Sequence, residues 1–238
     1  MSILEVQHLQ KIYTTRFGGS QVTALADVNF SVEPGEYVAV MGESGSGKTT
    51  LLNLLAALDR PTAGEVYLNG KAFSDIRERD LAAFRRSHLG FVFQDFNLLD
   101  TFSLPDNIFL PLVLAGRSYH EMRKKLKPIA EQLGIDQLLS KYPYEVSGGQ
   151  KQRAAVARAL ITDPQLVLAD EPTGALDSRA SDNLLELFGE INRGGQTIVM
   201  VTHSEKIVND AHRRVIQLES GVVVRDEMEG GYNLDVLA

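Results

Sequence analysis

The 238-residue sequence contains no cysteine, which excludes a disulfide framework and a metal site built on thiolates. It also lacks any apolar run of the roughly 20 residues that a helix needs to span a bilayer. Positive charge is not in excess, because 24 Lys and Arg stand against 31 Asp and Glu, for a formal net charge of -7. A general nucleic-acid binder normally carries a basic surface, so nucleic acid is not an expected partner.

The start of the sequence shows no targeting pattern either. Its first six residues alternate polar and apolar side chains and include no lysine or arginine, so no signal peptide is expected. With 44% hydrophobic and 23% charged residues, the composition is that of an ordinary globular protein. We therefore expect one or two cytosolic domains with a substantial core, which would serve a membrane only through a partner.

Short apolar runs alternate with helical patterns along most of the chain. Strands are expected at 3–9, 22–32 with a break midway, 37–41, 66–70, 88–93, 166–169, 197–201, 214–218 and 222–225. Helices are expected at 49–58, 76–87, 147–161 and 178–193, and a hairpin at 18–20. Continuous apolar strands between helices predict a parallel sheet that is covered on both faces.

The pattern changes between residues 95 and 145. Pro105, Pro111 and Pro128 interrupt helical patterns there, and no part of this stretch alternates convincingly between polar and apolar residues. We interpret the stretch as a helical insertion into an α/β core.

A glycine-rich segment lies between the strand at 37–41 and the helix at 49–58. It reads Gly42-Glu43-Ser44-Gly45-Ser46-Gly47-Lys48-Thr49 and fits the phosphate-loop pattern G-x-x-x-x-G-K-[ST]. Glycines let successive backbone N–H groups surround a phosphate, and the N-terminus of the next helix favours the same anion. Lys48 would neutralise the β- and γ-phosphates, and the Thr49 hydroxyl would bind Mg²⁺. A chance glycine-rich turn is the alternative, but the setting between strand and helix favours the phosphate loop.

Two acids follow the apolar strand at 166–169. A buried strand delivers its C-terminal residues to the edge where ligands bind in open α/β sheets. Asp170 is then placed to hold Mg²⁺, and Glu171 to orient or deprotonate an attacking water. Taken alone, acids before Pro172 are more often a turn at the end of a strand. The phosphate loop in the same chain favours the catalytic interpretation.

Three further motifs follow in a fixed order. Residues 146–153 read VSGGQKQR with ARAL at 157–160, residues 170–177 read DEPTGALD, and residues 201–203 read VTH. Together they resemble the signature, extended Walker B segment, D-loop and switch histidine of ABC ATPases, over essentially the whole chain. The resemblance implies one α/β ATPase domain over 1–238, with a P-loop NTPase core and an N-terminal antiparallel β-subdomain (about 1–94 and 146–238). A helical subdomain would be inserted at about 95–145.

The resemblance also implies roles for individual residues, with ATP and Mg²⁺ as cofactors. Glu171, His203 and Gln94 would be catalytic, with His203 as a γ-phosphate sensor and Gln94 linking the nucleotide to the helical insertion. The metal ligands would be Thr49, Gln94 and Asp170. The nucleotide-binding set would comprise an adenine-stacking aromatic, the phosphate loop, the signature and the D-loop, namely Tyr13, Gly42, Glu43, Ser44, Gly45, Ser46, Gly47, Lys48, Thr49, Thr50, Ser147, Gly148, Gly149, Gln150 and Asp177.

Ser147 is a good N-cap for the helix that runs to residue 161, and such a helix terminus would bind a γ-phosphate well. In ABC ATPases this terminus faces the nucleotide of a second subunit. The resemblance therefore implies a head-to-tail pair of ATPases, expected here to be a homodimer. A plain helix cap would explain the serine, but not the ordered motifs around it.

Residues 93–100 (FQDFNLLD) and 106–112 (DNIFLPL) resemble the subfamily of macrolide exporters, lipoprotein-release ATPases and bacitracin-type peptide-resistance ATPases. This implies an integral membrane permease with a large external domain, served from the cytoplasmic face. One alternative stays open: an ABC ATPase that regulates cell-wall hydrolases through a membrane partner, without transport.

Other side chains have plainer interpretations. Arg153, Arg158 and the basic run at 123–127 are expected to be solvated. Phe96, Leu98 and Phe102 fit either an apolar docking groove or core packing.

Overall fold

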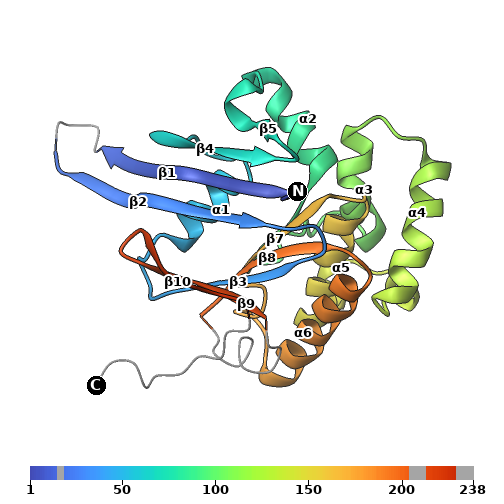
Figure 1. Cartoon of the computed structure of the whole chain (residues 1–238). Coiled ribbons are helices and arrows are strands. Elements are labelled where there is room, and N and C mark those ends of the chain that lie inside the picture. Colours follow the sequence, from blue (N-terminus) through green and yellow to red (C-terminus); the bar gives the residue numbers. More distant parts are fainter. Residues whose placement is uncertain (15–18, 204–212, 229–238) are drawn as a thin grey trace. The chain divides into compact units, whose positions relative to one another are not determined.

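The computed structural model describes residues 1–14, 19–203 and 213–228. The chain divides into two compact units, which we call unit 1 (Met1–Glu78 and Thr197–Ala238) and unit 2 (Arg79–Gln196). Within the described ranges, no helix is both long and apolar enough to cross a membrane. Figure 1 labels the elements of both units.

Unit 1 is built on strands in the order β5-β4-β1-β2-β10-β9-β3-β8. The strands are β1 (Leu4–Thr14), β2 (Gln21–Val32), β3 (Tyr37–Met41), β4 (Ala63–Leu68), β5 (Lys71–Ala72), β8 (Thr197–Val201), β9 (Arg214–Glu219) and β10 (Val222–Glu227). β3 pairs in parallel with both β8 and β9, whereas β1 pairs antiparallel with β2 and β4. Unit 1 therefore joins an antiparallel layer of strands to a parallel one.

All five residues of β3 and all five of β8 are buried, as continuous apolar strands of a parallel sheet should be. The helix α1 (Lys48–Leu55) lies against β2 and β8 and buries Leu51, Leu52, Leu54 and Leu55. The expected end of this helix at residue 58 is wrong. Ala57 already has a positive φ of 51°, which ends the helix, and Leu58 is exposed.

The break expected in the middle of the second strand is also wrong, because β2 continues through Gln21–Val32. The pairing of β2 with β1 is nevertheless irregular: β1 carries an extra residue between Val6 and Leu9, and β2 carries one between Leu25 and Val28. His8 stands at the first of these places with a positive φ of 49°, as a bulged residue does. The hairpin expected at 18–20 falls partly on residues outside the described ranges.

Unit 2 contains the parallel pair β6 (Leu89–Val92) and β7 (Leu166–Asp170) and most of the helices. The helices are α2 (Glu78–His88), whose first residue belongs to unit 1, α3 (Leu104–Leu114), α4 (Tyr119–Gln132), α5 (Gly148–Leu160) and α6 (Ser178–Arg193). Short 3₁₀ turns lie at Phe73–Asp75, Asp136–Leu138 and Pro143–Glu145, the first of them in unit 1.

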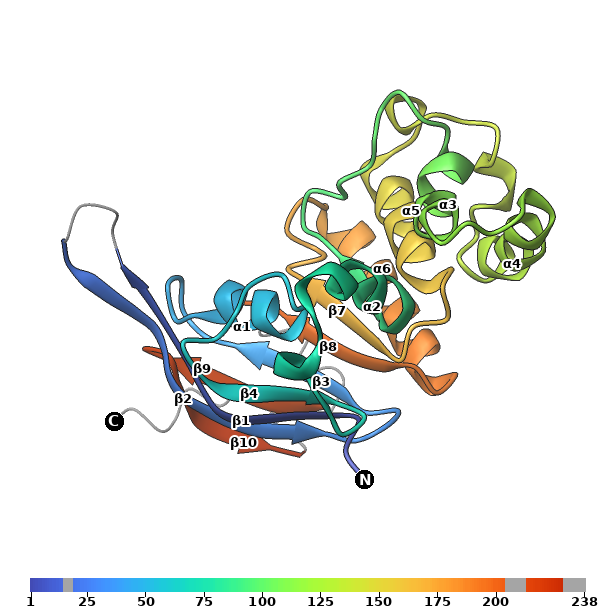
Figure 2. The same ribbon diagram turned by 90° about the horizontal axis from the view of Figure 1, so that it is seen from above.

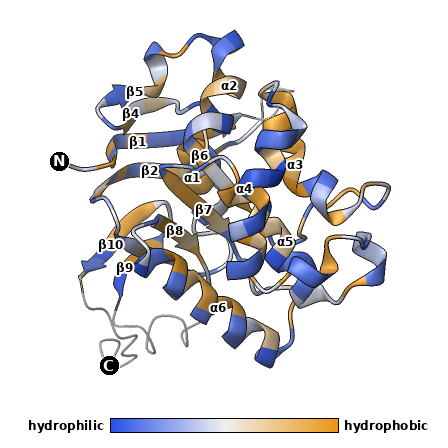
Figure 3. Ribbon diagram, turned by 90° about the vertical axis from the view of Figure 1, so that its right-hand side faces the viewer, coloured by the Kyte–Doolittle hydropathy of each residue, from blue (hydrophilic) through white to orange (hydrophobic). Residues whose placement is uncertain are grey.

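α5 packs against α3, α4, α6 and β6, and Figure 2 shows it beside α3 and α6. Its small residues Ala154, Ala155, Ala157 and Ala159 are buried, which lets neighbouring elements approach closely. α6 is amphipathic: it buries Leu184, Leu187, Phe188 and Ile191 and carries polar residues on its other face (Figure 3). The helices expected between residues 95 and 145 are confirmed as α3 and α4. The expected subdomain boundaries near 94 and 146 stay a prediction.

Candidate nucleotide site

The phosphate loop lies in unit 1, where it joins β3 to α1 as the sequence predicted. Its backbone needs glycine at two points for reasons of space and conformation. A Cβ atom on Gly42 would come within 2.2 Å of the Leu218 carbonyl oxygen, and φ there is 156°. A Cβ atom on Gly47 would lie 2.5 Å from the Ala24 carbonyl oxygen, at a φ of 104°. The curvature of the loop is thus fixed by close packing against β2 and β9.

Lys48 lies inside this loop and is only 7% exposed. Its Nζ atom donates hydrogen bonds to the carbonyl oxygens of Gly42 and Glu43, both at 2.7 Å. The buried Ser46 hydroxyl has no hydrogen-bond partner among the residues that the structure describes. A buried cation and an unused hydroxyl in one curved loop fit an anion such as a nucleotide phosphate. Thr49 is exposed at the first turn of α1 and Thr50 is half-buried there.

Tyr13 lies one residue before the end of β1 and is 42% exposed. Its hydroxyl donates to Asp59 Oδ2 at 3.0 Å, and Lys11 Nζ lies 4.9 Å from its ring centroid. Lys11 also donates to Asp59 Oδ1 at 2.7 Å. Burial alone would raise the pKa of Asp59, but hydrogen bonds from Lys11, the Arg60 amide and Tyr13 outweigh it and lower the pKa. The Tyr13 ring is therefore held in a fixed orientation while part of it stays open to a ligand.

His203 follows β8 and is exposed. Thr202, just before it, donates its backbone N–H to the Val40 carbonyl oxygen at 3.1 Å, which continues the pairing of β8 with β3. His203 therefore stands at the end of the strand next to the one that leads into the phosphate loop.

In unit 2, Gln94 follows β6 by two residues, and Asp170 is the last residue of the neighbouring parallel strand β7. Val92 of β6 pairs with Ala169 of β7, so both strands deliver their next residues to the same edge. Glu171 has a φ of 42°, an uncommon conformation for a non-glycine residue that is often found at functional sites. Asp170, Glu171 and Gln94 are thus brought to one edge of unit 2, and their roles there stay a prediction.

The signature residues begin α5. The Ser147 hydroxyl accepts from the Gln150 backbone N–H at 3.3 Å, and the Gln150 side chain accepts from the Ser147 N–H at 2.9 Å. This capping box fixes the helix terminus and leaves Ser147 exposed, with Gly148 and Gly149 half-buried behind it. The D-loop residue Asp177 caps α6 by accepting from the Ala180 N–H at 2.8 Å. Its contact with nucleotide stays a prediction.

The sequence did not predict the contacts of two side chains of α5. Arg158 was expected to be solvated, but its guanidinium donates to the backbone carbonyls of Phe96 and Asn97, and burial lowers its pKa. Gln152 is fully buried and donates from Nε2 to the carbonyls of Phe93 and Pro172. A usable signal for Gln152 was its place on the apolar stripe formed with Ala155, Val156 and Ala159.

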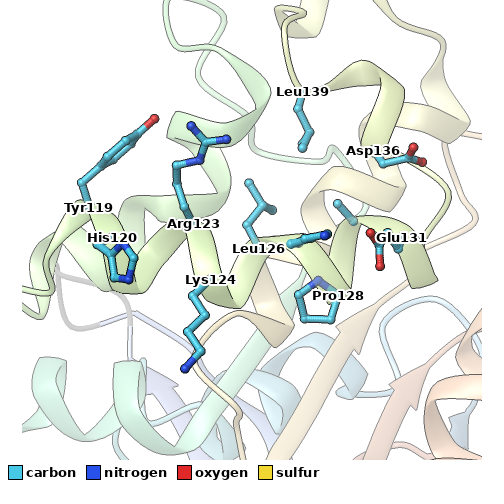
Figure 4. A pocket seen from close by; sticks show the side chains of 11 residues that line it. Tyr119, His120, Arg123, Lys124, Leu126, Pro128, Glu131, Asp136 and Leu139 are labelled. Atoms are coloured by element: carbon cyan, nitrogen blue, oxygen red, sulfur yellow. The ribbon is translucent and has the colours of Figure 1, made fainter.

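The helical part of unit 2 also contains a cavity of 780 Å³ along α4, lined in part by Tyr119, Arg123, Lys124, Leu126 and Glu131 (Figure 4). It includes none of the predicted site residues. Arg123, Lys124 and Lys127 are exposed, which confirms their solvated interpretation, whereas Lys125 forms an ion pair with Asp163.

The family described as ABC transporter matches residues 25–174. The ABC transporter ATP-binding protein YxdL of Bacillus subtilis is 48% identical over 96% of this chain and 88% of its own length. The bacitracin export ATP-binding protein BceA of Halalkalibacterium halodurans is 44% identical over 94% of this chain and 87% of its own. The macrolide export protein MacB of Hyphomonas neptunium is 43% identical, and the match covers 34% of its length.

Among solved structures, the dimeric ATP-binding cassette MJ0796 in a post-hydrolysis state bound to ADP and Pi superimposes with a TM-score of 0.84. It is 37% identical and covers 96% of this chain and 100% of that one. The chain therefore belongs to the ABC transporter family. It is an ATP-binding subunit that uses ATP with Mg²⁺ and hydrolyses it to drive transport.

Proposed function

We propose that this ATPase drives an integral membrane permease with a large external domain from the cytoplasmic face of the membrane. The work would be export, lipoprotein release or peptide-antibiotic resistance, with closure of the ATPases transmitted across the membrane. The observation that carries this proposal is the 44% identity to a bacitracin export ATP-binding protein, over 94% of this chain. The similarity to a macrolide export protein over 94% of this chain supports the same subfamily.

The phosphates would be held by the loop at 42–50, with Lys48 neutralising their charge. Thr49, Gln94 and Asp170 supply oxygen ligands of the kind that Mg²⁺ prefers, so the donor set fits that ion. When bound, Mg²⁺ would neutralise charge that develops on the phosphate oxygens. Phosphoryl transfer depends mainly on positioning and charge, so few further groups are needed.

In hydrolysis, Glu171 would orient a water for attack on the γ-phosphate and accept its proton, and His203 would contact the γ-phosphate. The Tyr13 ring would stack on adenine. Ser147 to Gln150 would face the nucleotide of a second, identical subunit, with Asp177 near the shared boundary. Because ATP would bind the closed pair better than the open one, binding closes the pair and hydrolysis reopens it.

The test is to trap the assembly in the source cell. Tagged Glu171→Gln is expected to bind Mg-ATP without hydrolysing it and to retain its partners through gentle solubilisation. Mass spectrometry should then find a stoichiometric membrane protein with a large external domain. Lys48→Ala is the matched control, because it should not hold the closed state. Recovery of soluble proteins only would overturn the proposal, and co-purification of wall hydrolases without a transported molecule would favour the regulatory alternative.

A further inference from the structure

Helix α5 makes two side-chain connections to the segment that contains Gln94. The segment follows β6 and has an irregular backbone, with positive φ values of 61° at Phe96 and 49° at Asn97. Such conformations cost free energy and persist only where the surroundings hold them. The groups that hold this segment come from a helix more than fifty residues further along the chain.

Arg158 makes the first connection. Its Nη2 atom donates to the Phe96 carbonyl oxygen at 2.7 Å, and its Nη1 atom donates to the Asn97 carbonyl oxygen at 2.5 Å. The planar guanidinium therefore binds two successive carbonyls of a left-handed turn, a geometry that a lysine ammonium reproduces only in part.

Gln152 makes the second connection, on the other side of Gln94. It is fully buried, and its Nε2 atom donates to the carbonyls of Phe93 at 3.2 Å and Pro172 at 2.8 Å. Phe93 directly precedes Gln94, and Pro172 directly follows Glu171. One amide group thus ties the segment after β6 to the segment after β7.

The Gln94 side chain itself lies against the second of these segments. A Cβ atom built on Gly174 would lie 3.0 Å from Gln94 Nε2. Gln152 therefore holds the backbone just before Gln94, and Arg158 holds it just after. The Gln94 side chain is confined by the loop after Glu171.

We propose that Arg158 and Gln152 are positioning residues that hold Gln94 in place for Mg²⁺ and tie it to the signature end of α5. The inference rests on the roles proposed above for Gln94 and Ser147. A helix rises about 1.5 Å per residue, so the eleven residues from Gly148, next to Ser147, to Arg158 form one rigid rod of about 16 Å. If the Ser147 end of α5 contacts nucleotide on a second subunit and the helix shifts, the segment that contains Gln94 would then shift with it.

The test uses Arg158→Met, Arg158→Lys and Gln152→Met in the full chain, with Arg153→Met as the matched control. Arg153 lies on the same helix and also donates to a backbone carbonyl, that of Leu133 at 2.8 Å, but this carbonyl belongs to the end of α4. Two quantities are measured: amide hydrogen exchange of residues 93–98 without nucleotide, and the Mg²⁺ concentration that gives half-maximal ATP hydrolysis. Binding of ATP without Mg²⁺ is measured alongside.

For Arg158→Met and Gln152→Met, we expect exchange of residues 93–98 to rise at least tenfold and the Mg²⁺ requirement to rise several-fold. Metal-free ATP binding should not change, because the phosphate loop is untouched. Arg158→Lys should restore part of both effects, and Arg153→Met should show neither. A merely structural role would lower the melting temperature and the active fraction without shifting the Mg²⁺ requirement. Unchanged exchange at 93–98, or equal effects in Arg153→Met, would overturn the inference.

Gln94→Ala separates this inference from the proposed function. If Gln94→Ala keeps the wild-type Mg²⁺ requirement, the role proposed for Gln94 is wrong, and with it the catalytic purpose of the contacts made by Arg158 and Gln152. If Gln94→Ala raises that requirement while Arg158→Met does not, the role of Gln94 stands and the positioning role proposed for Arg158 is wrong.

Discussion

The side chain of Gln94 lies so close to Gly174 that a Cβ atom at position 174 would stand 3.0 Å from Gln94 Nε2. We predict that Gly174→Val displaces the Gln94 side chain and lowers the rate of ATP hydrolysis at saturating ATP about tenfold, since small misplacements near a reacting centre are costly. Steady-state hydrolysis assays check this. The control is Ala175→Val, which introduces the same valine side chain at the next, exposed position of this loop. Wild-type turnover in Gly174→Val would contradict the prediction.

Lys48 places its ammonium against two carbonyl oxygens of the phosphate loop. Lys48→Ala should weaken ATP binding by more than tenfold, because a hydrogen bond to a charged group contributes roughly 1.5–3 kcal/mol. Calorimetric titration with ATP measures the loss. Lys124→Ala, which removes an exposed lysine of α4, should leave the affinity unchanged. Equal affinity in Lys48→Ala and wild type would argue against its assigned role.

Ser147 and Ser118 begin their helices with the same capping box, Ser147 with Gln150 and Ser118 with Glu121. Ser147→Arg and Ser118→Arg should therefore each cost about 1 kcal/mol of stability. Only Ser147→Arg should block the ATP-dependent dimer, because it places a bulky cation where the second nucleotide is expected. Light scattering of each variant in a Glu171→Gln background tests this. Dimer formation by Ser147→Arg would refute the shared site.

Local patterns predicted several strands and helices of both units with good accuracy. The strands at 37–41 and 197–201 and the helix at 178–193 appear with the expected bounds, because each is an apolar or amphipathic run between clear turn signals. The motif residues also fall where strands and helices begin or end. A motif of contiguous residues needs only local structure to form, so the sequence alone was sufficient to place these segments at the ends of their strands and helices.

The missed features all depend on tertiary contacts. Arg158 and Phe96 are 62 residues apart in sequence, and no local pattern indicates that one donates to the carbonyl of the other. On periodicity alone Arg158 looked like a solvated helix residue. Likewise, the break expected in β2 is an irregularity of pairing: the strand is continuous, but it carries an extra residue between Leu25 and Val28 opposite β1. Pairing between strands decides which of the two carries the extra residue.

Asp59 links Lys11 to Tyr13, and its pKa in the folded protein is below the usual value of 3.8. A carboxyl whose pKa is lowered by folding stabilises the protein above its unfolded pKa, and this stability is lost as pH falls through the folded pKa. Asp59→Asn should therefore lower the free energy of unfolding by about 1 kcal/mol or less at pH 7. The difference from wild type should shrink below pH 3.8. Urea unfolding at pH 7 and pH 3 measures it, with Asp75→Asn, an exposed carboxyl of the same unit, as control. A difference that grows in acid would contradict the sign.

Glu171 adopts a φ of 42°, which a residue with a Cβ atom reaches only at a cost of about 1 kcal/mol or more. Glycine has no such cost. Glu171→Gly should therefore be more stable than Glu171→Ala by about 1 kcal/mol, although both variants should bind ATP and hardly hydrolyse it. The order should reverse at Glu186 on the exposed face of α6, where glycine in a helix costs about 1 kcal/mol relative to alanine. Paired unfolding curves for the four variants make the comparison. If Glu171→Ala proved the more stable of its pair, Glu171 would not be strained, and its carboxylate would have to be held in place by side-chain contacts instead of by the backbone.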